Sequence, residues 1–148
     1  MSWARLLEES RVERHRSSRE EQVALRAVVE RNLADARVEA ISADTRFGCA
    51  YEAALILANA AIAAAGYRTK GLGHHRTVFE ALPLAVPGAA SKHDAQYFDR
   101  CRRLRNESSY EAAGVVGIRD LEELIARVLQ FEERIAAHLE RHFPGAWK

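Results

Sequence analysis

Apolar residues recur every three or four positions along most of the chain, the spacing that is typical of amphipathic helices. The pattern is clearest in two stretches. Phe47, Tyr51, Leu55, Ala58 and Ile62 repeat at three and four positions and are expected to face the core, and a second apolar face runs from Leu121 to Leu139. Glycine and proline, which end helices, fall in a few clusters between such stretches. No stretch alternates apolar and polar residues for long enough to suggest a sheet. The pattern predicts an all-α protein, an antiparallel helical bundle of four main helices plus short helices.

Capping residues and helix breakers set the expected ends of these helices. The first apolar stretch runs from Ser2 to about Val38, as one bent helix or as two, because Ser18 with Glu21 makes a capping box. The other helices are expected at Asp44–Gly66, His74 to about Leu82, Ser91 or Asp94 to about Ser109, and Asp120 to Pro144. Residues 67–73 are expected to form a loop, and Pro83 is expected to break the chain.

Length and charge narrow the class of protein. The 148 residues suit a single domain, 1–148, and 48% hydrophobic with 29% charged residues is the composition of a globular chain. Because 22 basic residues meet 21 acidic ones, the formal net charge is only +1. The overall field of the protein therefore does not drive binding to nucleic acid or membrane, although a local basic patch stays open.

The sequence also predicts a compartment. The longest apolar run, Ala53–Ala65, is shorter than a membrane span and is interrupted by Asn59, so we expect no membrane contact. The N-terminus lacks a basic segment followed by an apolar one, and two cysteines make no disulfide framework. These observations favour a cytoplasmic protein. No sequence signature for a cofactor or metal is present, since adjacent histidines such as His74 and His75 diverge on a helix.

The most informative stretch is residues 98–110, where Arg105 is followed by Asn106 and, five positions after the arginine, by Tyr110. Here the sequence resembles the HEPN superfamily, small helical bundles whose motif is an arginine, commonly a polar residue, and a histidine four to six positions after the arginine. The order of the helices agrees with this resemblance along the whole chain. The departure is Tyr110, which stands where the family has histidine.

The resemblance implies a role for each motif residue. Arg105 would stabilise negative charge at phosphorus, Asn106 would orient the arginine or the substrate, and the family's histidine would move the proton. Tyr110 is a poor base at neutral pH, because an ordinary phenol has a pKa of about 10. We therefore expect binding of nucleotide or RNA to survive better than catalysis.

Six further residues are candidates for binding. Arg102 and Arg103 lie one turn before Asn106 on the same expected helix; alternatively, Arg103 pairs with Glu107 on a solvated face. Glu52 and Asn59 interrupt the most apolar helix, either facing a shared cleft where Glu52 meets a motif arginine, or fixing the register of the helix as buried polar groups. The loop before residue 74 follows that helix, which makes His74 and His75 candidate cleft residues.

The leading hypothesis is a bacterial, cytoplasmic HEPN-like domain that binds nucleotide or RNA without catalysis. The resemblance also implies a homodimer whose two motifs line one cleft, and a nucleotidyltransferase partner of the toxin–antitoxin type. One alternative is a metal-independent endoribonuclease, with Tyr110 or a loop histidine such as His75 replacing the missing base. A second alternative is a non-catalytic helical module for dimerisation or docking.

Overall fold

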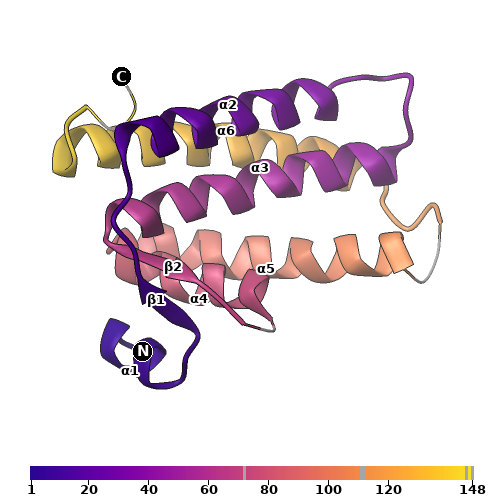
Figure 1. Ribbon diagram of the computed structural model, residues 1–148. Helices are drawn as coiled ribbons and strands as arrows, with labels where there is room; N and C mark the ends of the chain where they lie inside the picture. The colour runs from indigo at the N-terminus through magenta and orange to yellow at the C-terminus, as the bar shows by residue number, and fades with distance from the viewer. Residues whose placement is uncertain (72, 111–112, 146, 148) are drawn as a thin grey trace.

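The computed structural model describes residues 1–71, 73–110, 113–145 and 147, and of residues 108–110 only the backbone. Its elements in chain order are α1 (Trp3–Glu8), β1 (Val12–Arg14), α2 (Arg19–Ala36), α3 (Ala43–Ala64), β2 (Tyr67–Thr69), α4 (His74–Ala85), α5 (Ala89–Tyr110) and α6 (Ile118–His142). The predicted all-α helical bundle is confirmed, with four long helices, α2, α3, α5 and α6, that run side by side (Figure 1).

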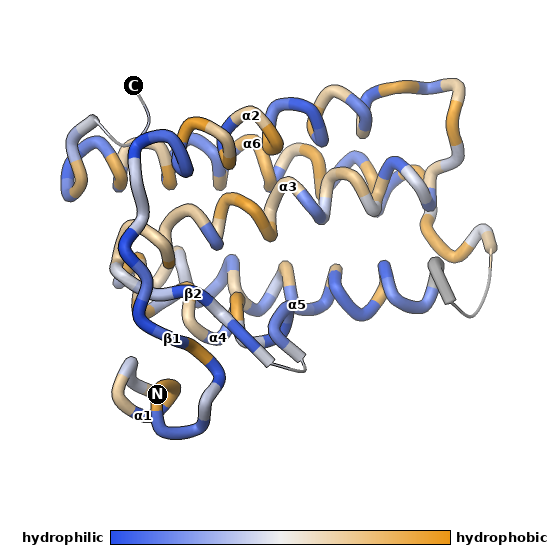
Figure 2. The backbone as a smooth tube through the Cα atoms, in the orientation of Figure 1, coloured by the Kyte–Doolittle hydropathy of each residue, from blue (hydrophilic) through white to orange (hydrophobic). Residues whose placement is uncertain are grey.

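The helix α3 is the centre of the bundle. It contacts α2, α6, α4 and α5, and Figure 1 shows it between α2 and α6 on one side and α5 on the other. Figure 2 shows α3 as a largely apolar helix and α5 as a largely hydrophilic one. The residues predicted to be the core face of α3 are all buried: Phe47, Tyr51, Leu55, Ala58 and Ile62.

The apolar character of α3 also bears on the membrane. Among the described residues, α3 is the one helix long and apolar enough to cross a bilayer by length and composition. The sequence prediction considered only the run from Ala53 to Ala65, whereas the full helix covers 22 residues. Within the bundle, 67% of its most apolar window is buried, as in the core helix of a soluble protein, so the composition of α3 is weak evidence for a membrane span.

The first stretch of the chain is two helices and not one. The hydroxyl oxygen of Ser18 accepts a hydrogen bond from the Glu21 amide at 3.1 Å, so α2 starts afresh where the capping box predicts. Between α1 and α2 lies β1, which pairs antiparallel with β2, with Val12 opposite Thr69 and Arg14 opposite Tyr67. Residues 67–69 were expected to belong to a loop, because strands of three residues are too short to show an alternating pattern.

The prediction that Asp44 is the N-cap of α3 is wrong. The N-cap is Ser42, whose hydroxyl oxygen accepts from the Thr45 amide at 3.2 Å. The Asp44 carboxylate instead accepts the amides of Gly114 and Val116, at 2.7 and 3.1 Å. Asp44 therefore ties the start of α3 to the connection between α5 and α6.

Three other helix ends differ from the prediction. Pro83 lies inside the last turns of α4, which continues to residue 85. The helix α5 begins at Ala89, ahead of both Ser91 and Asp94, and these two side chains are buried. In α6, Asp120 lies at the third helical position and accepts a hydrogen bond from the amide of the N-cap glycine at 3.1 Å.

Candidate functional site

The N-terminal segment holds the start of α4 in place. Arg11, just before β1, donates to the hydroxyl oxygen of Thr77 from Nε at 3.3 Å and from Nη2 at 3.1 Å, and it forms an ion pair with Glu80. Gly73, the residue before α4, has φ +73°, a left-handed conformation that favours glycine. These contacts fix the first turn of α4, which carries the two adjacent histidines.

A pocket of about 320 Å³, called here the basic pocket, lies between the first turn of α4 and the last turns of α5. It is lined by Gly73, His74, His75, Arg76, Arg102 and Asn106. Arg102 and Asn106 are one helical turn apart and therefore share a face of α5. Four residues that the sequence singled out at separate places, His74, His75, Arg102 and Asn106, thus meet in one pocket.

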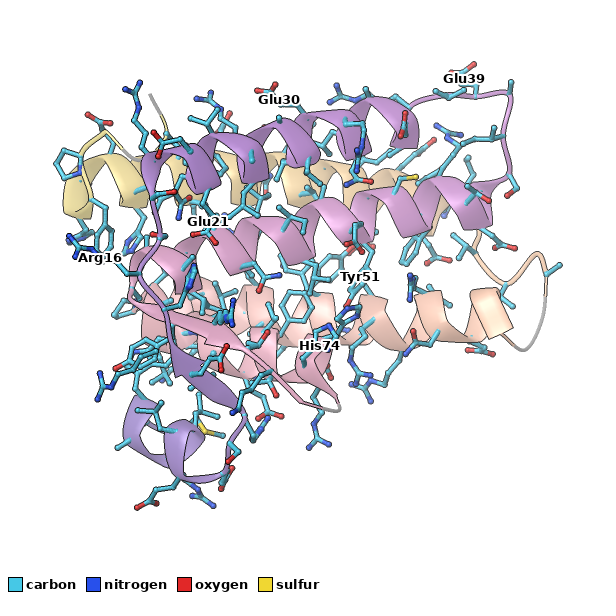
Figure 3. The ribbon with its side chains drawn as sticks, in the orientation of Figure 1. Arg16, Glu21, Glu30, Glu39, Tyr51 and His74 are labelled. Atoms are coloured by element: carbon cyan, nitrogen blue, oxygen red, sulfur yellow. The ribbon has the colours of Figure 1, made fainter. Side chains whose placement is uncertain are left out.

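Arg105 lies beside this pocket, and it is not one of the residues that line it. Its guanidinium carbon is 5.9 Å from the centroid of the Tyr51 ring, and its Nη1 donates to the side-chain oxygen of Asn106 at 3.5 Å. The Tyr51 ring is in turn 6.5 Å, centroid to centroid, from the ring of His75. Figure 3 shows Tyr51 reaching from α3 toward the side of the bundle where His74 lies.

The sequence analysis missed the lining residues Gly73 and Arg76, and it also missed Tyr51, which lies beside Arg105 and His75. Tyr51 was assigned to the core by its spacing, and it is indeed fully buried. Its hydroxyl is also buried and has no hydrogen-bond partner among the described residues. Burial raises the pKa of this phenol, and the nearby Arg102 and Arg105 oppose the rise only in part, so the hydroxyl is neutral. One feature of the sequence could have indicated a role for Tyr51: it places a polar hydroxyl in a helix that is otherwise rich in alanine.

The electrostatic surroundings keep His75 neutral. Burial lowers the pKa of His75, and the neighbouring His74, Arg105 and Arg102 lower this pKa further. Its imidazole therefore carries a lone pair at neutral pH and can accept a proton or a hydrogen bond. The ring of His74 lies edge-on to it, with 4.4 Å between the ring centroids.

Asp99 orients the arginines of α5. Its carboxylate accepts from Arg102 Nε at 2.9 Å and forms a second ion pair with Arg103 Nη2 at 3.4 Å. The alternative pairing of Arg103 with Glu107 is therefore not formed. Arg103 pairs instead with Asp99, four residues before it on α5. Arg103 is 67% exposed and is not a lining residue of the basic pocket, whereas Arg102 is held against its wall.

Two other candidates, Glu52 and Asn59, do not line this pocket. Glu52 is half-buried on α3, and among the described residues it forms no hydrogen bond or ion pair with an arginine of α5. Asn59, also half-buried, lies two turns further along α3 and does not line the pocket. The side chain of Tyr110 lies outside the described part of the chain. The expected cleft pairing of Glu52 is thus not formed.

The described residues contain no group of three or more histidine, cysteine, aspartate or glutamate side chains that could hold a metal ion. The chain matches no protein-family model, and the comparisons with curated proteins and with solved structures give no match. The chemistry of the site therefore follows from its own side chains: guanidinium groups, an amide, and a neutral imidazole.

Proposed function

We propose that this chain is a HEPN-like domain that binds the phosphate of a nucleotide or of RNA in the basic pocket. One observation carries the proposal: Arg102 and Asn106 of α5 line the same pocket as the adjacent histidines at the start of α4. Residues of the motif region on α5 thus share a pocket with hydrogen-bonding groups of a second helix, α4.

The donor set suits a phosphate. A guanidinium group offers several N–H donors in a fixed fork, which matches the oxygens of a phosphate. Asp99 already holds Arg102 at 2.9 Å, so little side-chain entropy is lost when Arg102 engages a ligand. The Asn106 amide adds a neutral donor at one turn's distance, and Gly73, the residue before α4, lines the same pocket.

Calorimetry with the full chain tests this proposal, using adenosine 5′-monophosphate and a short RNA as probes. The variant Arg102→Gln removes the charge and keeps most of the volume, and we expect about a tenfold loss of affinity or more. The matched control is Arg100→Gln, an exposed arginine on the same helix that does not line the pocket. Equal losses in both variants, or no binding by the unaltered chain, would contradict the proposal.

A second candidate function, metal-independent cleavage of RNA, is favoured by the neutral state of His75. In this reaction His75 takes the proton of a 2′-hydroxyl, the 2′-oxygen bonds to phosphorus, and the bond from phosphorus to the 5′-oxygen breaks. The 5′-oxygen leaves with a proton returned by the imidazolium, and the other product is a 2′,3′-cyclic phosphate. Arg102 and Arg105 would stabilise the charge that develops at phosphorus.

The two functions separate with end-labelled RNA in the presence of EDTA. Cleavage that Arg105→Ala and His75→Gln abolish, but that His93→Gln and EDTA leave intact, supports the endoribonuclease. His93 is an exposed histidine on α5 outside the pocket and serves as the matched control. Binding without cleavage supports the binding domain.

The homodimer and the nucleotidyltransferase partner remain part of the proposal. Sedimentation equilibrium at several concentrations tests the dimer, and co-purification with a nucleotidyltransferase encoded next to this chain tests the partner. A stable dimer that binds neither nucleotide nor RNA would instead favour the interaction module.

A further inference from the structure

A second pocket, of about 410 Å³, lies further along the same two helices and is called here the seam pocket. Its lining includes Glu80 and Pro83 of α4 and Lys92, Ala95 and Gln96 of α5. Nothing in the proposed phosphate site accounts for it.

The seam pocket is next to the basic pocket. Arg76 lines both of them. Asp99, in the wall of the seam pocket, accepts a hydrogen bond from Arg102, in the wall of the basic pocket, at 2.9 Å. From Gln96 to Arg102 is six residues, about 9 Å along a helix axis, a separation that one nucleotide can span.

The chemistry of the seam pocket differs from that of its neighbour. Phe79, Pro83 and Ala95 give it an apolar wall, and the exposed amide of Gln96 supplies one donor and one acceptor at the rim. An apolar wall with a few convergent polar groups is the usual lining of a site for a small planar ligand. A nucleobase has an apolar face for such a wall and a hydrogen-bonding edge for such an amide.

The carboxylates of the seam pocket do not repel a phosphorylated ligand. Glu80 forms ion pairs with both Arg11 and Arg76. Asp99 likewise forms ion pairs with two arginines, at 2.9 and 3.4 Å. Each negative charge is therefore shared by two guanidinium groups, and Lys92 adds a further cation, so this part of the surface is locally positive although the whole chain is nearly neutral.

We infer that the seam pocket receives the base of the nucleotide whose phosphate lies in the basic pocket. This inference rests on the proposed function and assigns the ligand as a base–phosphate unit, either a free nucleotide or one nucleotide of an RNA strand. Gln96 contacts the edge of the base, and Ala95 is small because the ring lies against it.

Calorimetry with adenosine 5′-monophosphate and ribose 5-phosphate, which lacks the base, tests the inference on the full chain. We expect the nucleotide to bind about tenfold more tightly, a typical gain from packing a base against a protein wall. Ala95→Leu fills the seam pocket and should lower the affinity for the nucleotide to that for ribose 5-phosphate. Its matched control is Ala126→Leu, at an exposed position of α6.

Gln96→Ala gives a second test at an exposed position, where folding is not at risk. It should weaken nucleotide binding and leave ribose 5-phosphate binding unchanged. Equal affinity of the unaltered chain for the two probes, or equal loss of both in Ala95→Leu and Gln96→Ala, would overturn the inference. The proposed phosphate site would still stand in that case if Arg102→Gln weakens both probes. Failure to bind either probe or RNA overturns both.

The source of the base–phosphate unit is a third arm of the same experiment. An uncleavable 2′-O-methyl trinucleotide that binds more tightly than the mononucleotide, and loses affinity in Ala95→Leu, assigns the seam pocket to one nucleotide of a strand. Tighter binding of the mononucleotide, with the same loss in Ala95→Leu, assigns it to a free nucleotide. Both results support the inference.

Discussion

The helix α5 carries two aspartates that each hold two arginines, yet the two clusters lie in different surroundings. Asp94, near the start of the helix, is only 4% exposed and forms ion pairs with Arg134 and Arg127 of α6. Asp99, five residues later, is 29% exposed and forms ion pairs with arginines of its own helix beside the pockets.

The difference indicates which cluster stabilises the fold and which is available to a ligand. Around Asp94 the charges join two helices, and Arg127 also packs over the ring of Tyr97, 4.1 Å from its centroid. Around Asp99 the ion pairs among the described residues lie within α5, so they add little to the stability of the bundle. Arg102 can therefore bind an anion from its place beside Asp99, where its ion pair contributes little to folding.

The strongest test of this comparison is Asp94→Ala. It leaves two partly buried guanidinium groups without their partner, so we expect the free energy of unfolding to fall by about 3 kcal/mol. Asp99→Ala should lower it by about 1 kcal/mol or less. Urea unfolding followed by circular dichroism measures both, and equal losses would show that the two clusters do not differ in this way.

The sequence predicted the fold where a long pattern was present. The core face of α3 and the buried positions of α6 follow a helical repeat over many turns, and both were predicted. Helix ends were predicted less well because several residues compete to cap the same turn. Asp44 and Asp120 are good caps locally, but Asp44 holds a distant loop, and Asp120 lies in the first turn of its helix and accepts the amide of the N-cap Gly117.

Several residues of the candidate site could be predicted from the sequence, but their meeting in one pocket could not. Arg102, Asn106 and the two histidines were visible because their types are chemically distinctive. Their meeting depends on how α4 packs against α5, where Phe79 and Phe98 lie 5.8 Å apart between ring centroids, and on the contact of Arg11 with Thr77 of α4. That contact joins positions 66 residues apart, and no local pattern encodes it.

A smaller difference in stability is expected between variants of two buried tyrosines, Tyr51 near Asp99 and Tyr97 near the ion pairs of Asp94. The Tyr51 hydroxyl has no partner among the described residues, so Tyr51→Phe should raise the free energy of unfolding by about 1 kcal/mol. The Tyr97 hydroxyl is not among the buried unpartnered side-chain atoms of the described residues, so Tyr97→Phe should bring no such gain. Urea unfolding again gives both values, and a loss of stability in Tyr51→Phe would mean that its hydroxyl is satisfied in solution.

The smallest effect concerns the protonation of His75, followed by NMR of the ring protons as the pH changes. Burial is the main reason that its pKa is lowered, and the charges of His74, Arg105 and Arg102 add to the effect. Because Arg102 contributes by repulsion, Arg102→Gln should raise the pKa of His75 toward the ordinary 6.5 without restoring it fully. His138 is the internal control: burial and the neighbouring His142 lower its pKa, so Arg102→Gln should leave it unchanged.

The lowered pKa of His75 also determines whether acidification raises or lowers the stability of the fold. The unfolded chain takes up a proton at this histidine more readily than the folded one, so protonation near and below pH 6.5 favours unfolding. The contribution of His75 to stability is therefore fully present above that pH and falls as the pH decreases. His75→Gln should reduce the loss of stability on acidification, measured by urea unfolding between pH 7.5 and pH 5 under otherwise equal conditions. An unchanged slope would place this histidine in solvent, away from the arginines, and would weaken both the phosphate site and the proposed proton transfer.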